Sequence, residues 1–565
     1  MGSIVQNVNL SSRFSYERFE KLVDDCIDFY NRSLKGRESS GCFKRRSQLA
    51  RYIRKFHFDS ETLTPHVEAA IKKLESDSCL LLMTAHQPNL FAYSGVLRKA
   101  TLNHVLAKRL SERLGVPVVS FFGIADQDFT DDKWVKSAWL PDVARREGLL
   151  KLHFDMPERL MLSKVSKPER RILDAWRSEI RSWICRELNS VRIACKALGI
   201  ELTEENWFIG NFEAFWKLVE EVYGQAKNYA DFNAYLMSRI VNNIWEYNTV
   251  FSRFSECQQI FEGEFCYLLS NFEEYSRCVE ESSSLLCGMK NGVREQESET
   301  IPFWYHCDCG SKARLKAEQK TGSLIGRGRC VRCEKEYVLD FGSSNEPRMA
   351  DYIKRVSARS LSMPLVFFNG LKVSCYIGGV GGTTYLQQAQ RVSEHLGMTF
   401  APVAVWRPRD VYLGVGQMEA FITFKKLSGS FDFSKYSQAE NSFREKVLAV
   451  QNKIDELEAQ KKQLIGCSNP QKETQVQNLK ALSAKQNELR RAAAFPELKS
   501  NLGLLENVSA VMNLYPCIVD YAVNIGLKET SEQWIDFLQN NGNLSSNVRL
   551  TTPFDDIGVI SKNLR

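Results

Sequence analysis

The stretch CLLLMTAHQPNL, residues 79–90, decides how the chain folds. Residues 79–85 are a continuous apolar run, which is typical of a short strand buried on both faces. A polar turn at 86–89 follows, then a helical pattern over 96–114 and a second apolar run over 116–124. A strand, a helix and a strand in this order predict a βαβ unit with a right-handed crossover, and therefore a parallel sheet.

A second unit of this kind is predicted in the C-terminal half. Strand-like runs cover 364–368, 372–377 and 399–406, and a glycine-rich turn at 378–382 and a helix at 383–396 lie between the last two. We expect this unit to complete the first sheet, which predicts an α/β fold with a Rossmann-type parallel-sheet core. In such open sheets, ligands bind beyond the carboxyl ends of the strands.

The composition is that of a large globular protein. The chain has 565 residues, of which 44% are hydrophobic and 25% charged, and it exceeds the usual size of a single core. The net charge of +7 is a mild excess, which allows a nucleic-acid partner without favouring one. We expect a cytoplasmic protein with no membrane segment, because no apolar run reaches about 18 residues, the first residues lack a secretory pattern, and the scattered cysteines suit a reducing compartment.

Two other parts of the chain have helical patterns. Residues 140–300 are rich in Trp and Phe at helical spacing, and they predict a helical insertion. Residues 440–495 are charged, with apolar positions three and four apart and a break at 466–470. This pattern predicts an antiparallel coiled-coil hairpin, through which two subunits could pair as a homodimer. Two surface helices packed on the body are the alternative.

The most specific motif is a cluster of cysteines. Cys307 and Cys309 form one close pair, and Cys330 and Cys333 form a second pair about twenty residues later. Two pairs at this spacing can converge on one tetrahedral Zn²⁺, which favours thiolate ligands in structural sites. The neighbouring His306 is an alternative ligand, and free thiols are the alternative to a metal. A four-thiolate site has no open position, so we assign it to structure or partner binding rather than catalysis.

These patterns divide the chain into six expected units. They are the N-terminal half of a Rossmann-like core (1–135), a helical connecting insertion (136–300), a zinc ribbon (301–345), the C-terminal half of the core (346–436), a coiled-coil hairpin (437–498) and an α/β tail (499–565).

Two polar motifs follow the first two strands, at the edge where ligands bind. His86, Gln87 and Asn89 come directly after the first strand, and His86 could there donate a hydrogen bond to a phosphate oxygen. Asp126 and Asp128 come after the second strand and would lie on one side of an extended chain, where they could orient an ammonium group, act as a base or hold Mg²⁺. The alternatives are a histidine that caps the next turn and a turn that separates the two carboxylates.

Two further motifs follow the strands of the second unit. Between a strand and a helix, backbone N–H groups of a glycine-rich turn can approach an anion; its glycines are Gly378, Gly379, Gly381 and Gly382. Arg407 and Arg409 follow the last core strand, and their guanidinium groups suit a carboxylate or a phosphate. The alternatives are a tight turn with close helix packing and solvated arginines.

The order of these motifs resembles the family of bacillithiol-biosynthesis cysteine-adding enzymes. The residues that carry the resemblance are 84–91, 114–119 with 126–129, 357–366 and 376–385, followed by Arg407-Pro408-Arg409 and the coiled coil. They lie within residues 79–130 and 350–495. The sequence departs from the family pattern in three ways: Gln127 stands where the family has His, Gly382 stands where it has Glu, and the ribbon is an addition.

The resemblance implies a core related to class I aminoacyl-tRNA synthetases and nucleotidylyltransferases. It implies a ligase that joins cysteine to a small amine, such as an amino-sugar conjugate, by an amide bond, with ATP and Mg²⁺ as expected co-reactants. His86, Asp126 and Asp128 would then be catalytic. The substrate or nucleotide would be bound by Gln87, Asn89, Gly378, Gly379, Gly381, Gly382, Tyr385, Arg407 and Arg409.

The sequence is also compatible with three functions other than this ligase. One is an RNA- or tRNA-binding zinc-ribbon protein, the second is a synthetase-like enzyme of other specificity that forms an aminoacyl adenylate, and the third is a scaffold without catalytic activity.

Overall fold

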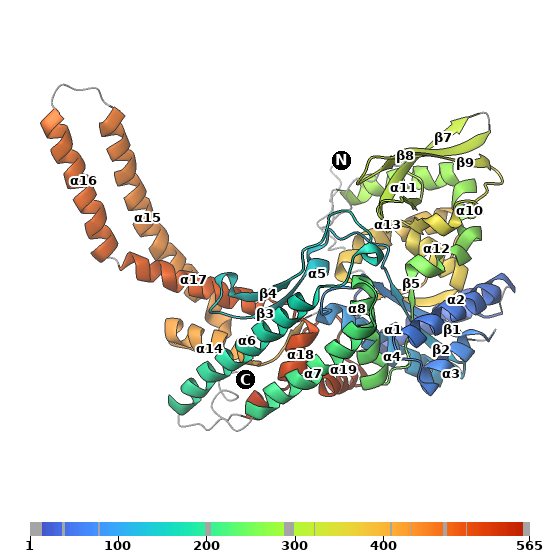
Figure 1. Ribbon diagram of the computed structural model, residues 1–565, viewed down its shortest axis with the longest axis horizontal. Helices are drawn as coiled ribbons and strands as arrows, with labels where there is room; N and C mark the ends of the chain where they lie inside the picture. Colours follow the sequence, from blue (N-terminus) through green and yellow to red (C-terminus); the bar gives the residue numbers. More distant parts are fainter. Residues whose placement is uncertain are drawn as a thin grey trace, which may run out of the picture.

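The computed structural model confirms a mixed α/β fold built on a parallel sheet (Figure 1). It describes residues 14–36, 40–76, 79–197, 205–287, 299–320, 322–406, 409–430, 432–466, 472–492 and 494–556. The sheet has five strands in the order β12-β11-β1-β2-β5, and each neighbouring pair is parallel. In that order, the strands are Val403–Val405, Val373–Gly378, Leu80–His86, Val118–Ile124 and Val250–Arg253.

Strand β1 lies in the centre of this sheet and is buried on both faces, as its apolar run predicts. Leu82 packs on one face with helices α1 (Phe19–Phe29) and α4 (Ser94–Leu114). Leu81 and Met83 pack on the opposite face. The helices of that face are α2 (Ser40–Asp59), α3 (Pro65–Leu74), α12 (Ser362–Leu371) and α13 (Thr383–His395).

One predicted strand is wrong, because residues 364–368 lie in helix α12. This helix is buried almost all round, so its apolar run has no period that distinguishes a helix from a strand. Pro364 fits in its first turn, where no backbone N–H donor is needed. Lys372 ends the helix in the left-handed conformation, with φ 54°. Strands β11 and β12 and helix α13 match the rest of the predicted second unit.

The segment between β2 and the cysteine cluster is mostly helical, as predicted, but it also contributes strands. The antiparallel hairpin of β3 and β4 comes early in it, and β5 returns to the parallel sheet beside β2. The core therefore extends into residues that the sequence assigned to the insertion. The other elements are α5 (Lys133–Lys136), β3 (Ser137–Pro141), β4 (Leu149–His153), α6 (Arg170–Ala197), α7 (Glu205–Gln225), α8 (Tyr229–Arg239), α9 (Phe254–Cys257), α10 (Glu262–Ser270) and α11 (Phe272–Cys287).

The cysteine cluster belongs to a second sheet, with five strands in the order β10-β6-β7-β8-β9 and antiparallel pairing throughout. We call it the ribbon sheet. In Figure 1 it lies beside α11, above the parallel sheet. Its strands, in sheet order, are Val356–Ala358, Phe303–His306, Lys312–Lys320, Ser323–Cys330 and Glu336–Ser343.

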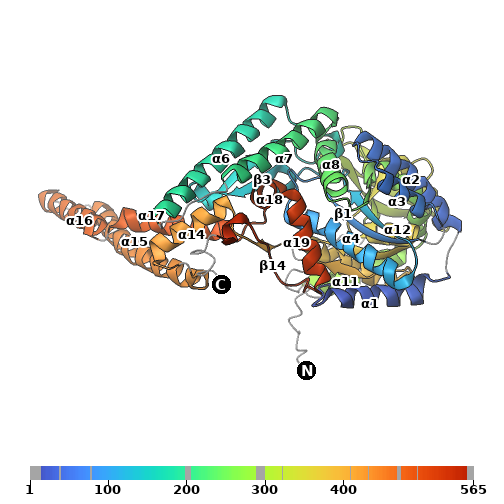
Figure 2. The same ribbon diagram turned by 90° about the horizontal axis from the view of Figure 1, so that it is seen from below.

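Helices α15 (Tyr436–Gly466) and α16 (Lys472–Ala492) lie side by side and project from the body (Figures 1 and 2). The Gln486 side chain joins them, because its amide donates to the Ile454 carbonyl at 3.1 Å and accepts from Lys461 at 3.0 Å. This arrangement matches the predicted antiparallel hairpin, and residues 467–471 between the helices lie outside the described residues.

The base of the projection and the tail are formed by α14 (Val415–Ser428), α17 (Phe495–Met512), α18 (Ile518–Asn524) and α19 (Leu527–Gln539). Strand β14 (Val548–Arg549) pairs in parallel with β13 (Asp410–Val411), so the tail contains both helix and strand. Within the described ranges, the helices are too short or too polar to cross a membrane.

Candidate functional site

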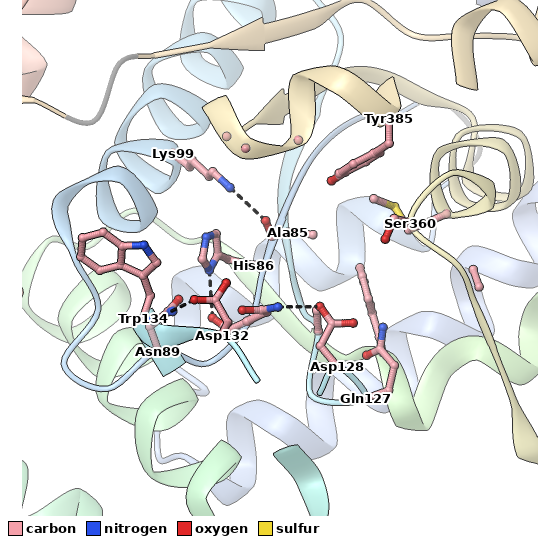
Figure 3. Close-up of a pocket in the computed structure, with 18 of the residues that line it drawn as sticks. Ala85, His86, Asn89, Lys99, Gln127, Asp128, Asp132, Trp134, Ser360 and Tyr385 are labelled. Atoms are coloured by element: carbon pink, nitrogen blue, oxygen red, sulfur yellow. Dashed lines mark hydrogen bonds between the residues drawn. The ribbon is translucent and has the colours of Figure 1, made fainter. Parts of the chain in front are cut away.

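A cavity of about 450 Å³ opens at the carboxyl ends of β1, β2 and β11 (Figure 3). It brings together three of the predicted motifs: the turn after β1, the turn after β2 and the glycine-rich turn after β11. The predicted residues that line it are His86, Gln87, Asn89, Asp128, Gly379, Gly381, Gly382 and Tyr385. These segments are more than 200 residues apart in the sequence at their extremes, and the parallel sheet places their strand ends at one edge.

His86 is the last residue of β1, and its ring is fixed by two contacts. Nδ1 lies 3.0 Å from the Gln87 carbonyl and Nε2 lies 3.4 Å from the Tyr93 hydroxyl. Burial, reinforced by the nearby charge of Lys99, lowers the pKa of His86 to about 3. The imidazole is therefore neutral near pH 7, and since a carbonyl only accepts, Nδ1 carries the proton. Nε2 is then a hydrogen-bond acceptor, which does not fit the expected donor to phosphate, and the low pKa makes it a weak base.

The two predicted carboxylates point to different places, because the chain turns at residues 126–128. Asp128 faces the cavity, and its Oδ2 accepts a hydrogen bond from Gln87 Nε2 at 3.2 Å. Burial raises the pKa of Asp128, and the charge of Lys312 and the Gln87 hydrogen bond oppose that effect. Asp128 is thus a half-buried carboxylate with a polar partner at the cavity wall.

Asp126 is fully buried and outside the lining. It accepts hydrogen bonds from the backbone N–H of Ser255, at 2.9 Å, and from the Ser255 hydroxyl. Burial raises its pKa to about 6, although both Ser255 hydrogen bonds work in the opposite direction. Asp126 therefore ties the end of β2 to the first turn of α9, and the amide of Gln127 takes its place at the cavity.

The glycine-rich turn approaches other cavity residues closely. A Cβ at Gly379 would lie 3.3 Å from Lys99 Nζ, and a Cβ at Gly382 would lie 2.9 Å from the Tyr385 hydroxyl. Burial raises the pKa of Tyr385 to about 12, so it is a neutral hydroxyl group at the cavity. Gly378 is the last residue of β11 and is buried in the sheet, outside the lining.

Of the two predicted arginines that follow β12, Arg409 is outside the cavity lining. Arg407 lies outside the described residues. Arg409 points away from the cavity, because its guanidinium donates to the Met512 carbonyl at 3.0 Å and to the Asn513 side chain at 2.5 Å. Its place is at the junction with the C-terminal helices, which no local sequence pattern indicates.

Lys99 is one of the cavity residues that the sequence patterns do not indicate. It lies on α4 and is 5% exposed, with its amine 3.1 Å from the Ala85 carbonyl at the end of β1. Burial lowers its pKa to about 7, so the amine can exchange a proton near neutral pH. The available signal was position: Lys99 stands in the second turn of the helix that follows the His86 motif, at the ligand-binding edge of the sheet.

Aromatic rings form another wall of the cavity. Tyr93 and Trp134 line it, with ring centroids 4.8 Å apart, and Trp134 also lies 5.9 Å from the ring of Tyr515. Asp132 lies beside them and caps the short helix α5 by accepting from the Trp134 N–H at 2.8 Å. Figure 3 shows Trp134, Asp132 and His86 around the same side of the cavity.

The four predicted cysteines do converge. Their sulfur atoms all lie within 4.8 Å of one another, with Cys307 and Cys333 3.5 Å apart and Cys309 and Cys330 3.6 Å apart. Four sulfurs around a tetrahedral metal with bonds of about 2.3 Å would be about 3.8 Å apart, so the cluster has the size and the donor set for one metal ion. The four-sulfur set is complete without the alternative ligand His306.

A second group of metal-binding side chain types, Glu274, Cys278 and His395, lies at the surface of α11 and α13. Glu274 is already paired with Arg277 at 2.5 Å, and His395 is exposed. We assign no site to it.

Comparison with models of known protein families finds no match, and comparison with curated proteins finds none either.

Proposed function

We propose that this protein is a ligase that joins the carboxyl group of an amino acid to a small amine by an amide bond, with cysteine as the first candidate. The observation that carries the proposal is the single cavity in which His86, Lys99, Asp128 and the glycine-rich turn meet. A hydrogen-bond acceptor for the amine, a cation, a carboxylate and backbone N–H groups are what such a reaction requires of the protein. The ordered motifs of the resembling family support the same reaction.

Each group has a chemical task in this proposal. The carboxylate of Asp128, oriented by Gln87, holds the α-ammonium group of the amino acid. The Lys99 amine and the backbone N–H groups of Gly379 to Gly381 stabilise negative charge on a carboxylate or phosphate. His86 Nε2 accepts a hydrogen bond from the N–H of the attacking amine and orients it, and the proton that the amine loses passes to solvent.

The expected activation uses ATP. A carboxylate oxygen of the amino acid attacks the α-phosphorus and pyrophosphate leaves, which gives an aminoacyl adenylate. The amine nitrogen then attacks the carbonyl carbon, and AMP leaves as the amide bond forms. Expected Mg²⁺ would need a carboxylate ligand, and besides Asp128 the cavity offers Asp132. A core of the class I synthetase type belongs to the same proposal.

We also propose that the cysteine cluster holds a structural Zn²⁺, since four thiolates without an open position are typical of such sites. Metal analysis of the full-length protein should give one zinc ion per chain. Cys330→Ser should lose it, whereas Cys185→Ser, at an exposed cysteine outside the cluster, should keep it. A full zinc content in Cys330→Ser would contradict the assignment.

The RNA-binding alternative has less support. Basic side chains of the ribbon sheet are largely paired with neighbouring carboxylates, which lowers their attraction for phosphates. These pairs are Lys316 with Glu299, Arg327 with Glu318, Arg329 with Glu336 and Lys335 with Asp308.

The test of the ligase is pyrophosphate release by the purified protein with ATP and each amino acid in turn, with glucosamine as a first amine. We expect release with one amino acid, loss of that activity in His86→Ala and retention in His66→Ala, a matched change at an exposed histidine. Absence of turnover with every amino acid would refute the ligase. Unchanged activity in His86→Ala would refute the role of this cavity.

A further inference from the structure

We propose that the ribbon sheet is one wall of the cleft and that Lys312, on its strand β7, positions Asp128. The role of Lys312 rests on the proposed function, because it concerns the carboxylate assigned there to the substrate ammonium. A series of contacts continues from the cysteine cluster to the cavity.

The first contacts join the cysteine cluster to the segment that precedes α6. Gly310, which directly follows the first cysteine pair, accepts a hydrogen bond from the N–H of Met161 at 3.0 Å. The guanidinium of Arg159 donates to the carbonyl of Val331, inside the second pair, at 2.8 Å. A Cβ at Gly310 would lie 2.9 Å from Leu160, so the turn and this segment touch without space for a side chain.

The next contacts join that segment to the turn after β2. The N–H of Leu162 donates to the Asp128 carbonyl at 3.0 Å, and the N–H of Ser163 donates to the Asp126 carbonyl at 2.8 Å. Phe129 and Met161 form an antiparallel bridge in the same place. The turn at 126–128, which directs Asp128 to the cavity, is therefore hydrogen-bonded to the segment 159–163, and that segment is in turn hydrogen-bonded to the cysteine cluster.

Side chains of the ribbon sheet complete the series. The Lys312 amine lies 4.2 Å from the centre of the Phe129 ring, and the Trp304 ring meets Phe129 edge-on at 5.5 Å. Lys312 is 2% exposed, so its charge acts on its neighbours with little screening by water. Burial raises the pKa of Asp128, and Lys312 provides the largest opposing effect. Lys312 thereby helps to keep Asp128 in the carboxylate form.

Three other titratable groups act on or near Asp128. Asp132 raises its pKa further, and the hydroxyls of Tyr376 and Tyr385 lie within its electrostatic influence. Lys312 itself also faces Asp126 and Arg359. Among these groups, Lys312 is the cation that the ribbon sheet supplies to Asp128. The ribbon also supplies lining directly, since Ala358 ends β10 and borders the cavity.

The first test measures hydrogen exchange in the full-length protein, with zinc bound and after removal by a chelator. We expect exchange in peptides that cover 126–130 and 159–164 to become about tenfold faster or more without the metal, because that ratio corresponds to a loss of about 1.4 kcal/mol of local protection. The β3–β4 hairpin, 137–153, should change little. Unchanged exchange at 126–130 would overturn the proposal, whatever the protein's activity.

The second test compares Lys312→Met with Lys316→Met, a matched change on the same strand at a lysine that is 55% exposed. Both variants should bind one zinc per chain. In Lys312→Met, the pH at which pyrophosphate release reaches half its maximum should move upward by about one unit, a tenfold change in the proton affinity of Asp128, and Lys312→Arg should restore it. An equal profile in Lys312→Met and Lys316→Met would overturn the positioning role. If the wild type turns over no amino acid, the ligase fails, and the exchange experiment alone decides the ribbon wall.

Discussion

Replacing Lys99 with methionine should stabilise the protein while it removes a group from the cavity. Lys99 is 5% exposed, and the Ala85 carbonyl at 3.1 Å is its hydrogen-bond acceptor. Burial of an amine favours its neutral form, because the charged form loses its hydration. Methionine has a similar length and volume without the charge, so the change tests the cost of the buried cation and leaves the packing nearly intact.

The size of the effect follows from the pKa of Lys99. It falls from 10.5 to about 7 on burial, and each pKa unit corresponds to about 1.36 kcal/mol. Because the folded-state pKa is the lower one, the cost of the charge is complete below pH 7 and disappears as the pH rises toward 10.5. This gives a cost of about 4.5 kcal/mol at pH 6 and about 2 kcal/mol at pH 9. Lys99→Met should therefore raise the free energy of unfolding by these amounts, less about 1 kcal/mol at both pH values for the lost hydrogen bond to Ala85.

Urea unfolding of wild type and Lys99→Met at pH 6 and pH 9 measures this difference. The gain in the free energy of unfolding should be about 2.5 kcal/mol larger at pH 6 than at pH 9. Lys108→Met, at an exposed position of the same helix, should show no such dependence. Equal gains at the two pH values, or a loss at both, would show that Lys99 is not a desolvated amine. Pyrophosphate release should fall in the same variant, because the cavity loses its cation.

Three further predictions concern other buried positions. Because the pKa of His86 is about 3, its ring should not titrate near 6.5, and an NMR imidazole signal that titrates there in the wild type and is absent from His86→Ala would contradict the lowered pKa. Burial and Asp142 raise the pKa of Glu187 from 4.5 to about 8; the cost of its buried charge is therefore small near pH 5 and complete above pH 8, so Glu187→Gln should raise the melting temperature more at pH 9 than at pH 5. Gly123→Ala places a Cβ 2.1 Å from the ring of Phe254 and should lower the melting temperature, whereas Gly210→Ala, in open helical space, should not.

The elements that the sequence predicted best are those whose structure follows from a local sequence pattern. Strands β1, β2 and β11 are continuous apolar runs between turns, and the cysteine pairs have a spacing that leaves few alternatives. Helix α12 was misread because burial on all sides removes periodicity. Strand β5 was missed because four residues inside a helical region give too short a pattern.

The positions of single charged residues could not be predicted in this way. Lys99 and Lys312 carry the side chain type that is most often exposed, and their burial depends on segments far away in the sequence. The same holds for Arg409, whose partners Met512 and Asn513 come from the C-terminal helices. From local patterns, such a residue is expected to be exposed to solvent or to bind a ligand. Tertiary packing can instead bury it against distant segments of the chain.

The Asp126-Gln127-Asp128 motif shows how one short segment serves both the fold and the cavity. The turn after β2 directs Asp126 to Ser255 at the start of α9 and Asp128 to Gln87 at the cavity. The first contact fixes where β5 and α9 lie relative to β2. The Phe254 ring of α9 already packs directly against Gly123 of β2, where a side chain would collide with it. The second contact is then made by a carboxylate whose backbone cannot move independently. A chain that placed both carboxylates in the cavity would lose this anchor, so the separation of the two aspartates is what gives Asp128 a defined direction.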